Sequence, residues 1–134
     1  TLETASYLPE PPLSFRALDE IDAGVCDGMT YAEVRRRFPD EFAARAKDKL
    51  NYRYPRGESY RDVIQRLDPV IIEIERHEHP ILIIGHQGVL RALYAYLMDT
   101  PPRDSPHLPM PLHTVLELTP NAYGCTERRF PLAA

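Results

Sequence analysis

Apolar residues recur at helical spacing in the stretch that follows Ser59. They occupy positions 63, 67, 70, 71 and 74, which lie on one face of a helix. Ser59 and Asp62 resemble a capping box, in which the residue before a helix and its third residue exchange hydrogen bonds with the backbone. Pro69 lies inside the pattern, and a proline within a helix removes a main-chain donor. We therefore expect a helix after Ser59 that kinks at Pro69.

A continuous apolar run, Pro-Ile-Leu-Ile-Ile-Gly, fills positions 80–85. Strands that are buried on both faces of a parallel sheet have this composition, so the run predicts such a strand. From Gln87 onward the apolar positions return to helical spacing. His86 and Gln87 are therefore expected where a strand ends and a helix begins.

The other predicted elements are shorter. Thr30 and Glu33 form a capping-box pattern that opens a helix ending at Arg37, and Pro39 starts another that runs to about Leu50. The remaining segments predict the end of a helix at 1–8, a short strand at 14–18, loops at 19–29, 51–58 and 100–111, and strands at 112–118 and 124–130. Helices that alternate with buried strands indicate a layered α/β domain.

Composition narrows the possible functions of the chain. Its 134 residues are 43% hydrophobic and 27% charged, as in an ordinary globular domain. The net charge of −4 argues against nucleic acid as a partner, and no apolar run is long enough for a membrane helix. Cys26 and Cys125 have no metal-binding spacing, which favours a reduced, cytoplasmic location. The first residues, Thr-Leu-Glu-Thr-Ala, read as the middle of a helix, so we expect the chain to be cut from a longer one.

His86 and its neighbours are the first candidate site. Open α/β sheets bind ligands where strands end, and the unpaired N–H groups of a helix N-terminus suit a phosphate. Arg91 lies one helical turn after Gln87, so both side chains share a face, and an arginine can hold phosphate oxygens with two hydrogen bonds. Taken alone, His86 could equally be a buried histidine whose ring is satisfied by its neighbours.

An acidic loop is the second candidate. It contains Asp19, Glu20 and Asp22. Cleavage of a phosphate ester needs a proton donor for the leaving oxygen, and a carboxylic acid can supply it. The same residues could also form nothing more than a solvated surface loop.

A third group is scattered along the chain and comprises Tyr31, Arg45, Lys49 and Tyr60. Arg45 and Lys49 are four residues apart on one predicted helix, so they can present two positive charges together. Such a pair usually covers a surface, and this interpretation also stays open.

Several longer motifs resemble one known family. They are LDEIDAGVCDGMTYAEV, DKLNYRYPRGESY, ILIIGHQGVLRALYAYLM and PLHTVLELTPNAYGC, within residues 1–126. They are similar to the bisphosphatase half of the bifunctional 6-phosphofructo-2-kinase/fructose-2,6-bisphosphatases, in the phosphoglycerate mutase-like histidine phosphatase superfamily. The resemblance implies a three-layer α/β fold with a mostly parallel sheet and helices on both faces. It makes residues 1–134 the C-terminal part of one such domain, without its N-terminal segment.

The resemblance implies hydrolysis of the 2-phosphate of fructose 2,6-bisphosphate to fructose 6-phosphate and phosphate, a step that controls glycolysis and gluconeogenesis. In this family a histidine of an Arg-His-Gly motif attacks the phosphorus, and water then hydrolyses the phosphohistidine. His86 is similar to the second active-site histidine, which stabilises the transferring phosphoryl group, and Glu20 to the acid that protonates the leaving oxygen. The substrate-binding positions of the family match Tyr31, Arg45, Lys49 and Tyr60 for the fructose 6-phosphate portion, and Gln87 and Arg91 for the phosphates and the sugar.

The same resemblance implies which cofactors and partners to expect. The phosphatase reaction uses no metal or other cofactor, while ATP and magnesium belong to a separate kinase domain on the N-terminal side of the parent chain. The expected partners are a sugar phosphate, that kinase domain and, as one option, a second copy of the chain in a homodimer. Neither nucleic acid nor a membrane is expected.

One departure from the family is large, because no Arg-His-Gly triplet occurs in the 134 residues. Without that nucleophile the covalent route is closed, so we expect the chain alone to be inactive. The loss of a central strand should also leave it marginally stable. Two alternatives stay open: another phosphatase or a mutase of the superfamily, and a catalytically inactive module that binds sugar phosphates or a protein partner.

Overall fold

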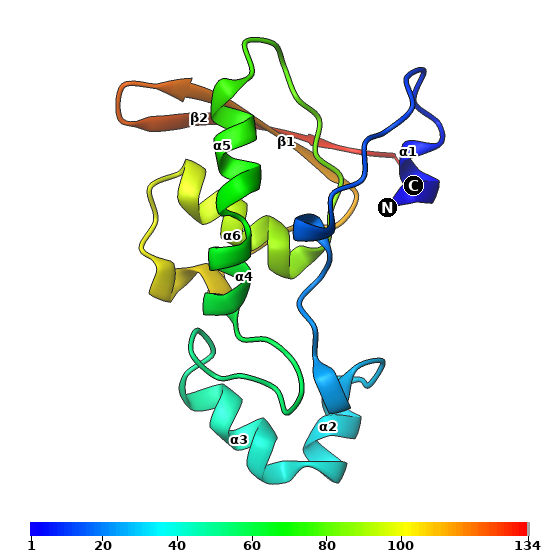
Figure 1. Ribbon diagram of the computed structural model, residues 1–134, viewed down its shortest axis with the longest axis vertical. Helices are drawn as coiled ribbons and strands as arrows, with labels where there is room; N and C mark the ends of the chain where they lie inside the picture. Colours follow the sequence, from blue (N-terminus) through cyan, green and yellow to red (C-terminus); the bar gives the residue numbers. More distant parts are fainter. Residues whose placement is uncertain (134) are drawn as a thin grey trace.

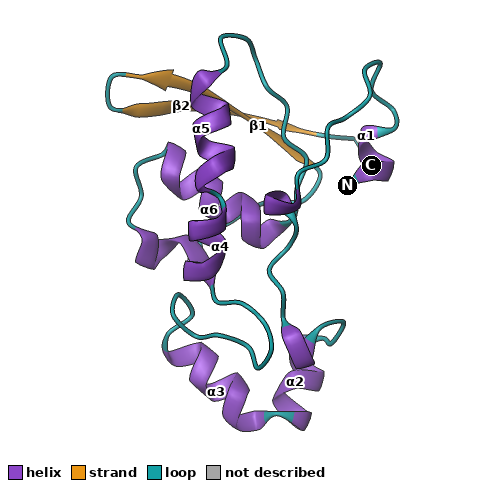
Figure 2. Cartoon of the chain, in the orientation of Figure 1, coloured by secondary structure: helices purple, strands orange, loops and turns teal. Residues whose placement is uncertain are grey.

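The computed structural model describes residues 1–133 and contains both helices and strands (Figure 1, Figure 2). The α-helices are α1 (Leu2–Ala5), α2 (Tyr31–Arg37), α3 (Pro39–Lys47), α4 (Tyr60–Arg66), α5 (Asp68–Arg76) and α6 (Gln87–Leu97). The connecting segments contain the 3₁₀-helices η1 (Arg16–Leu18), η2 (Gly24–Cys26) and η3 (Pro102–His107), and the strands are β1 (Thr114–Asn121) and β2 (Gly124–Pro131). Within the described residues, no helix is both long and apolar enough to cross a membrane.

The main core lies between α4, α5 and α6. Val63 of α4 and Leu67, which follows α4, pack with Val89 and Leu93 of α6, and each of these side chains is at most 3% exposed. In Figure 1, α5 continues from the end of α4, and α6 lies alongside. This packing holds the start of α6 close to the first turn of α4, where several of the predicted site residues lie.

A smaller core supports the other end of the molecule. Cys26, Val34 and Tyr54 are buried together, and they join η2, α2 and the loop that precedes α4. Figure 1 shows α2 and α3 at this end, away from the hairpin of β1 and β2.

The predicted helix starts at Thr30 and Ser59 are confirmed. Thr30 Oγ1 accepts a hydrogen bond from the N–H of Glu33 at 3.2 Å, and the Glu33 carboxylate accepts one from the N–H of Thr30 at 3.0 Å. Ser59 and Asp62 make the same exchange, with distances of 3.1 Å and 2.8 Å. Each capping box supplies partners for N–H groups that a helix start leaves free.

The predicted helix after Ser59 is divided in two near Pro69. α4 ends at Arg66, α5 begins at Asp68, and Leu67 lies between them. Pro69 has no N–H with which to continue the ladder of α4, but it is well tolerated in the first turn of α5. The prediction of a single kinked helix is therefore wrong, and a break replaces the kink.

β1 and β2 form an antiparallel hairpin, with Thr114 opposite Pro131 and Asn121 opposite Gly124. The side chains at 114, 116 and 118 are half-buried, and those between them are exposed. This alternation turns one face of β1 toward the rest of the protein. The strands predicted at 112–118 and 124–130 are confirmed, with ends shifted by a few residues.

The predicted strand at 80–85 is absent within residues 1–133, where the run lies in a loop (Figure 2). A strand exists through hydrogen bonds to a neighbour, and the hairpin is the only sheet in this part of the chain. Ile81 and Leu82 are 42% and 59% exposed, so the predicted burial on both faces is also wrong here. The strand predicted at 14–18 is wrong as well, since residues 16–18 form η1, and the loop predicted at 100–111 contains η3.

Candidate active site

The carboxylate of Glu20 lies at the first turn of α6. The N–H of Gly88 donates to Glu20 Oε2 at 3.2 Å, and the N–H of Ile21 donates to Oε1 at 2.9 Å. N–H groups in the first turn of a helix have no partner within the helix, so a carboxylate is well placed there. Glycine suits position 88, because a Cβ there would lie 2.6 Å from Glu20 Oε1. Glu20 is half-buried, so the interpretation as a solvated loop is wrong for this residue.

His86 is the residue just before the first turn of the same helix, at its N-cap position. Its main chain is extended, with φ −104° and ψ 161°, and its carbonyl oxygen accepts a hydrogen bond from the N–H of Leu90 at 2.9 Å. The side chain is exposed and makes no capping hydrogen bond. The alternative of a buried, satisfied histidine is therefore wrong. The imidazole is accessible at the helix start that also binds Glu20.

Tyr60, the first residue of α4, connects two cations. Its hydroxyl accepts a hydrogen bond from Arg91 Nη1 at 3.2 Å, and Lys49 Nζ lies 5.7 Å from the centre of its ring. Tyr60 is only 3% exposed, so its surroundings leave the ring little freedom to move. An ammonium group over an aromatic face is attracted by the charge distribution of the ring. Tyr60 therefore brings Lys49 and Arg91 to one place.

Arg45 of α3 lies between two tyrosines. Its guanidinium carbon is 5.6 Å from the ring centre of Tyr31 and 5.4 Å from that of Tyr54. Tyr31 is 64% exposed, whereas Tyr54 is 9% exposed, and burial raises the pKa of the Tyr54 hydroxyl. Tyr54 was not among the predicted site residues. Its one sequence signal is its place in the run Asn-Tyr-Arg-Tyr at 51–54.

The cations of Arg45, Lys49 and Arg91 act on one another. Burial, together with the positive charges of the two arginines, lowers the pKa of Lys49 from 10.5 to about 8. Among residues 1–133, none of the three forms an ion pair with a carboxylate. Like charges that converge without a counter-ion disfavour one another, and a bound anion reverses this effect. The interpretation as a surface-covering pair is wrong for Lys49, which is half-buried.

A proline-rich segment, 106–110, runs along these cations. Its carbonyl oxygens at Pro106, Leu108 and Met110 accept hydrogen bonds from Lys49 Nζ at 2.9 Å, Arg91 Nε at 2.8 Å and Gln87 Nε2 at 3.2 Å. Pro106 and Pro109 have no N–H, so the segment offers acceptors and few donors. The sequence predicted only a loop here. Its role in orienting three of the predicted site residues is visible only in the structure.

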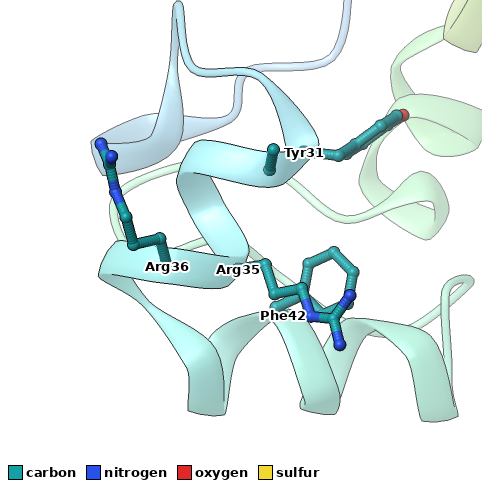
Figure 3. A pocket seen from close by; sticks show the side chains of 5 residues that line it. Tyr31, Arg35, Arg36 and Phe42 are labelled. Carbon is teal, nitrogen blue, oxygen red and sulfur yellow. The ribbon is translucent and has the colours of Figure 1, made fainter.

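An open hollow of about 580 Å³ lies beside Tyr31 (Figure 3). Arg35, Arg36 and Phe42 line it, and the guanidinium carbon of Arg35 lies 5.9 Å from the ring centre of Phe42. Figure 3 shows Tyr31 pointing away from Arg36. Of the predicted site residues only Tyr31 lines the hollow, so Arg45, Lys49, Tyr60 and Arg91 do not face it.

The structure arranges the predicted residues in two connected groups. The first, at the start of α6, comprises Glu20, His86 and Gln87. The second, around Tyr60, comprises Tyr31, Arg45, Lys49, Tyr60 and Arg91. Arg91 lies one turn after Gln87 on α6, so that helix joins the groups. Guanidinium and ammonium groups and the N–H groups of a helix start suit the binding of a phosphate ester, and a carboxylic acid at that helix start can supply a proton. In the described part of the chain, no three His, Cys, Asp or Glu side chains are placed to hold a metal ion.

Comparison with known proteins shows to which family the chain belongs. The model of the histidine phosphatase superfamily (branch 1) matches residues 1–131. The chain is 56% identical over 131 residues to a 6-phosphofructo-2-kinase/fructose-2,6-bisphosphatase of Arabidopsis thaliana, and 57% identical over 124 residues to the fructose-2,6-bisphosphatase of Saccharomyces cerevisiae. These alignments cover 98% and 92% of this chain, but 18% and 27% of the two relatives. The chain thus spans less than a third of the length of these relatives.

Solved structures have the same fold. YhfR of Bacillus stearothermophilus superimposes with a TM-score of 0.75 and 28% identity, covering 97% of this chain and 66% of that one. The α-ribazole phosphatase of Shigella flexneri gives a TM-score of 0.79 with 21% identity, covering 97% of this chain and 67% of that one. The second similarity concerns the fold alone. With the family match, these structures confirm the predicted α/β fold class.

Proposed function

Because the chain belongs to the histidine phosphatase superfamily (branch 1), we propose that it forms the acid and sugar-phosphate part of a fructose-2,6-bisphosphatase. The reaction is hydrolysis of the 2-phosphate of fructose 2,6-bisphosphate, which gives fructose 6-phosphate and phosphate. The names of relatives that are 56% and 57% identical support this substrate. The observation that carries the proposal is the group of cations around Tyr60, which forms no ion pair with a carboxylate of residues 1–133 and suits a doubly phosphorylated sugar.

Two residues at the start of α6 have proposed roles in the chemistry. Glu20 protonates the oxygen that leaves with the sugar, and later accepts a proton from the water that attacks the phosphohistidine. His86 donates a hydrogen bond to the phosphoryl group during its transfer, where negative charge is spread over the equatorial oxygens. Free N–H groups at the helix start add to this stabilisation.

The other six residues bind the substrate. Arg45 and Lys49 attract the 6-phosphate, while Tyr31 and Tyr60 border the fructose 6-phosphate portion. Gln87 and Arg91, on one face of α6, hold the phosphates and the sugar between the two groups. Lys49, Arg91 and Gln87 are held in orientation by carbonyl oxygens of segment 106–110, so little side-chain freedom has to be lost on binding.

The nucleophile is the part that these 134 residues do not provide. The phosphohistidine route of the family uses a histidine in an Arg-His-Gly triplet, and this triplet is absent from the sequence. We therefore propose that residues 1–134 alone turn over no fructose 2,6-bisphosphate. The proposal also places the chain in a cytoplasmic bifunctional protein, with ATP and magnesium confined to a kinase domain.

The test uses the full-length native polypeptide and the 134-residue chain side by side. We expect the former to release fructose 6-phosphate from fructose 2,6-bisphosphate, and the latter to release none. Release of phosphate from 3-phosphoglycerate or α-ribazole 5′-phosphate in preference would favour another member of the superfamily. Binding of fructose 6-phosphate by the full-length polypeptide without any turnover would favour the inactive binding module.

A further inference from the structure

Arg66, the last residue of α4, is bonded to the loop that carries Glu20. Its Nη1 donates to the carbonyl oxygen of Ala17 at 2.5 Å, and its Nη2 donates to those of Asp19 at 2.6 Å and Glu20 at 3.2 Å. The side chain is 23% exposed. A guanidinium has a rigid fork of donors, so one side chain can satisfy several carbonyl oxygens at fixed angles.

Glu58 holds the same loop from the other side. Its carboxylate accepts from Arg66 Nε at 2.9 Å and Nη2 at 3.2 Å, and its Oε1 also accepts from the N–H of Asp22 at 3.1 Å. The N–H of Glu58 donates to the carbonyl oxygen of Asp22 at 2.7 Å. Gly57 permits this close approach, because a Cβ there would lie 2.3 Å from the carbonyl oxygen of Asp22.

These contacts matter because residues 19–23 belong to no helix or strand. The main chain at Glu20 is therefore not fixed by a ladder of its own, and within residues 1–133 the hydrogen-bond partners of its carboxylate are the N–H groups of Ile21 and Gly88. A proton donor is effective only when it lies within hydrogen-bond reach of the leaving oxygen.

We propose that Arg66 and Glu58 are positioning residues that hold the Glu20 carboxylate at the start of α6. The inference rests on the proposed function only in taking Glu20 as the acid. Within the described residues, neither side chain forms a hydrogen bond or ion pair with Arg45, Lys49 or Arg91, so substrate affinity should depend on them little. Their effect should fall on the protonation of the leaving group.

The kinetic test compares two leaving groups in the full-length native polypeptide. The sugar oxygen of fructose 2,6-bisphosphate needs a proton to leave, whereas p-nitrophenolate leaves readily without one. Arg66→Met should lower kcat for fructose 2,6-bisphosphate by about 10–100-fold, with KM nearly unchanged, and lower hydrolysis of p-nitrophenyl phosphate by less than about threefold. Glu58→Gln and Arg66→Lys, which disturb the fold less, should show the same selectivity with smaller losses.

Arg53 offers a matched control. It also makes a two-bond pair, with Asp62 of α4 and with both distances at 2.8 Å, on a more exposed side chain. Within the described part of the chain it forms no hydrogen bond with residues 17–22. Arg53→Met should leave the ratio of the two activities unchanged. Equal losses on both substrates in Arg66→Met, or the same selectivity in Arg53→Met, would show that Arg66 acts only through general stability.

A second measurement does not depend on turnover. The amide hydrogens of Ile21 and Gly88 report the position of the Glu20 carboxylate, so their exchange should be about tenfold faster in Arg66→Lys and unchanged in Arg53→Met. Unchanged exchange in Arg66→Lys would overturn the positioning role. If the native polypeptide hydrolyses no fructose 2,6-bisphosphate, the proposed function fails, and the exchange data still decide the role of Arg66.

Discussion

Lys49 Nζ donates a hydrogen bond to the carbonyl oxygen of Pro106 at 2.9 Å, across 57 positions of the chain. This half-buried cation is therefore hydrogen-bonded to a neutral dipole. A carbonyl oxygen stabilises an ammonium group less than a carboxylate does. Burial and the charges of Arg45 and Arg91 lower the pKa of Lys49, so its ammonium group should respond strongly to an anion that enters the site.

The lowered pKa predicts that sugar-phosphate binding weakens above pH 8. Lys49 is charged below about pH 8 and loses its charge as the pH rises further, while a phosphate monoester stays a dianion. Bound phosphate raises the pKa of Lys49, so the weakening should be gradual. Calorimetric titration of the full-length polypeptide with fructose 6-phosphate should show this trend. Lys49→Met should bind more weakly and show no such trend between about pH 7 and about pH 9.5.

The same shift predicts a change in stability with pH. Unfolded Lys49 keeps its proton up to about pH 10.5, whereas the folded protein releases it near pH 8, so the unfolded state binds more protons in between. The charged lysine therefore destabilises the folded state fully below pH 8, and this destabilisation decreases as the pH rises toward 10.5. Urea unfolding should show that the free energy of unfolding of the wild type, relative to that of Lys49→Met, is larger at about pH 9.5 than at about pH 7. A constant difference between the two proteins would contradict this.

Removal of Arg45 should weaken substrate binding. Arg45→Met leaves an apolar chain between Tyr31 and Tyr54 but deletes a cation, and the loss of a charge-assisted hydrogen bond costs about 1.5–3 kcal/mol. We expect KM for fructose 2,6-bisphosphate to rise about 10–100-fold, with a smaller effect on kcat. Lys47→Met is the control, since Lys47 is exposed on the same helix. Equal effects of the two substitutions would show that only net charge matters.

Removal of the His86 imidazole should slow the reaction without disturbing the fold. The side chain is exposed and does not cap α6, so His86→Ala should leave the unfolding transition nearly unchanged. Loss of one hydrogen-bond donor to the transferring phosphoryl group should lower kcat about 10²–10³-fold. His79→Ala, at an exposed histidine in the preceding loop, should retain full activity. Normal turnover in His86→Ala would contradict the proposed role of His86 in stabilising the transferring phosphoryl group.

A methyl group at position 88 should displace the Glu20 carboxylate. The Cβ of Gly88→Ala would lie 2.6 Å from Oε1, the far end of a flexible side chain, so the carboxylate can move while the helix stays intact. Alanine favours a helix more than glycine by about 1 kcal/mol, so stability should be kept or raised. We expect kcat to fall about tenfold with KM unchanged. Unaltered kcat, at unaltered stability, would mean that the position of Glu20 is unimportant.

Local patterns predicted the helix starts well. The capping boxes at Thr30 and Ser59 form as expected, because each involves residues only three positions apart. The hairpin was also predictable, since its strands are adjacent in the chain. The pattern correctly predicted that the helix is disturbed near Pro69, but it predicted a kink where the structure has two separate helices.

The run at 80–85 shows where local reasoning ends. Its composition is that of a buried strand, yet a strand needs hydrogen-bonding neighbours, and none lies beside it within residues 1–133. Exposure of Leu82 follows from the same cause. Composition reports what a segment prefers, while its neighbours determine what it forms.

The sequence alone determined the helix starts at Thr30 and Ser59 and the two strands of the hairpin, because each of these depends on residues close together in the chain. The candidate site residues came instead from the resemblance of longer motifs to one family. Tertiary structure decided that Tyr60 meets Arg91, that Lys49 is held by Pro106 and that Glu20 reaches Gly88. These contacts join residues 31, 57 and 68 positions apart. The packing of α6 against α4 and against η3 brings such distant groups together, since no local preference acts over that separation.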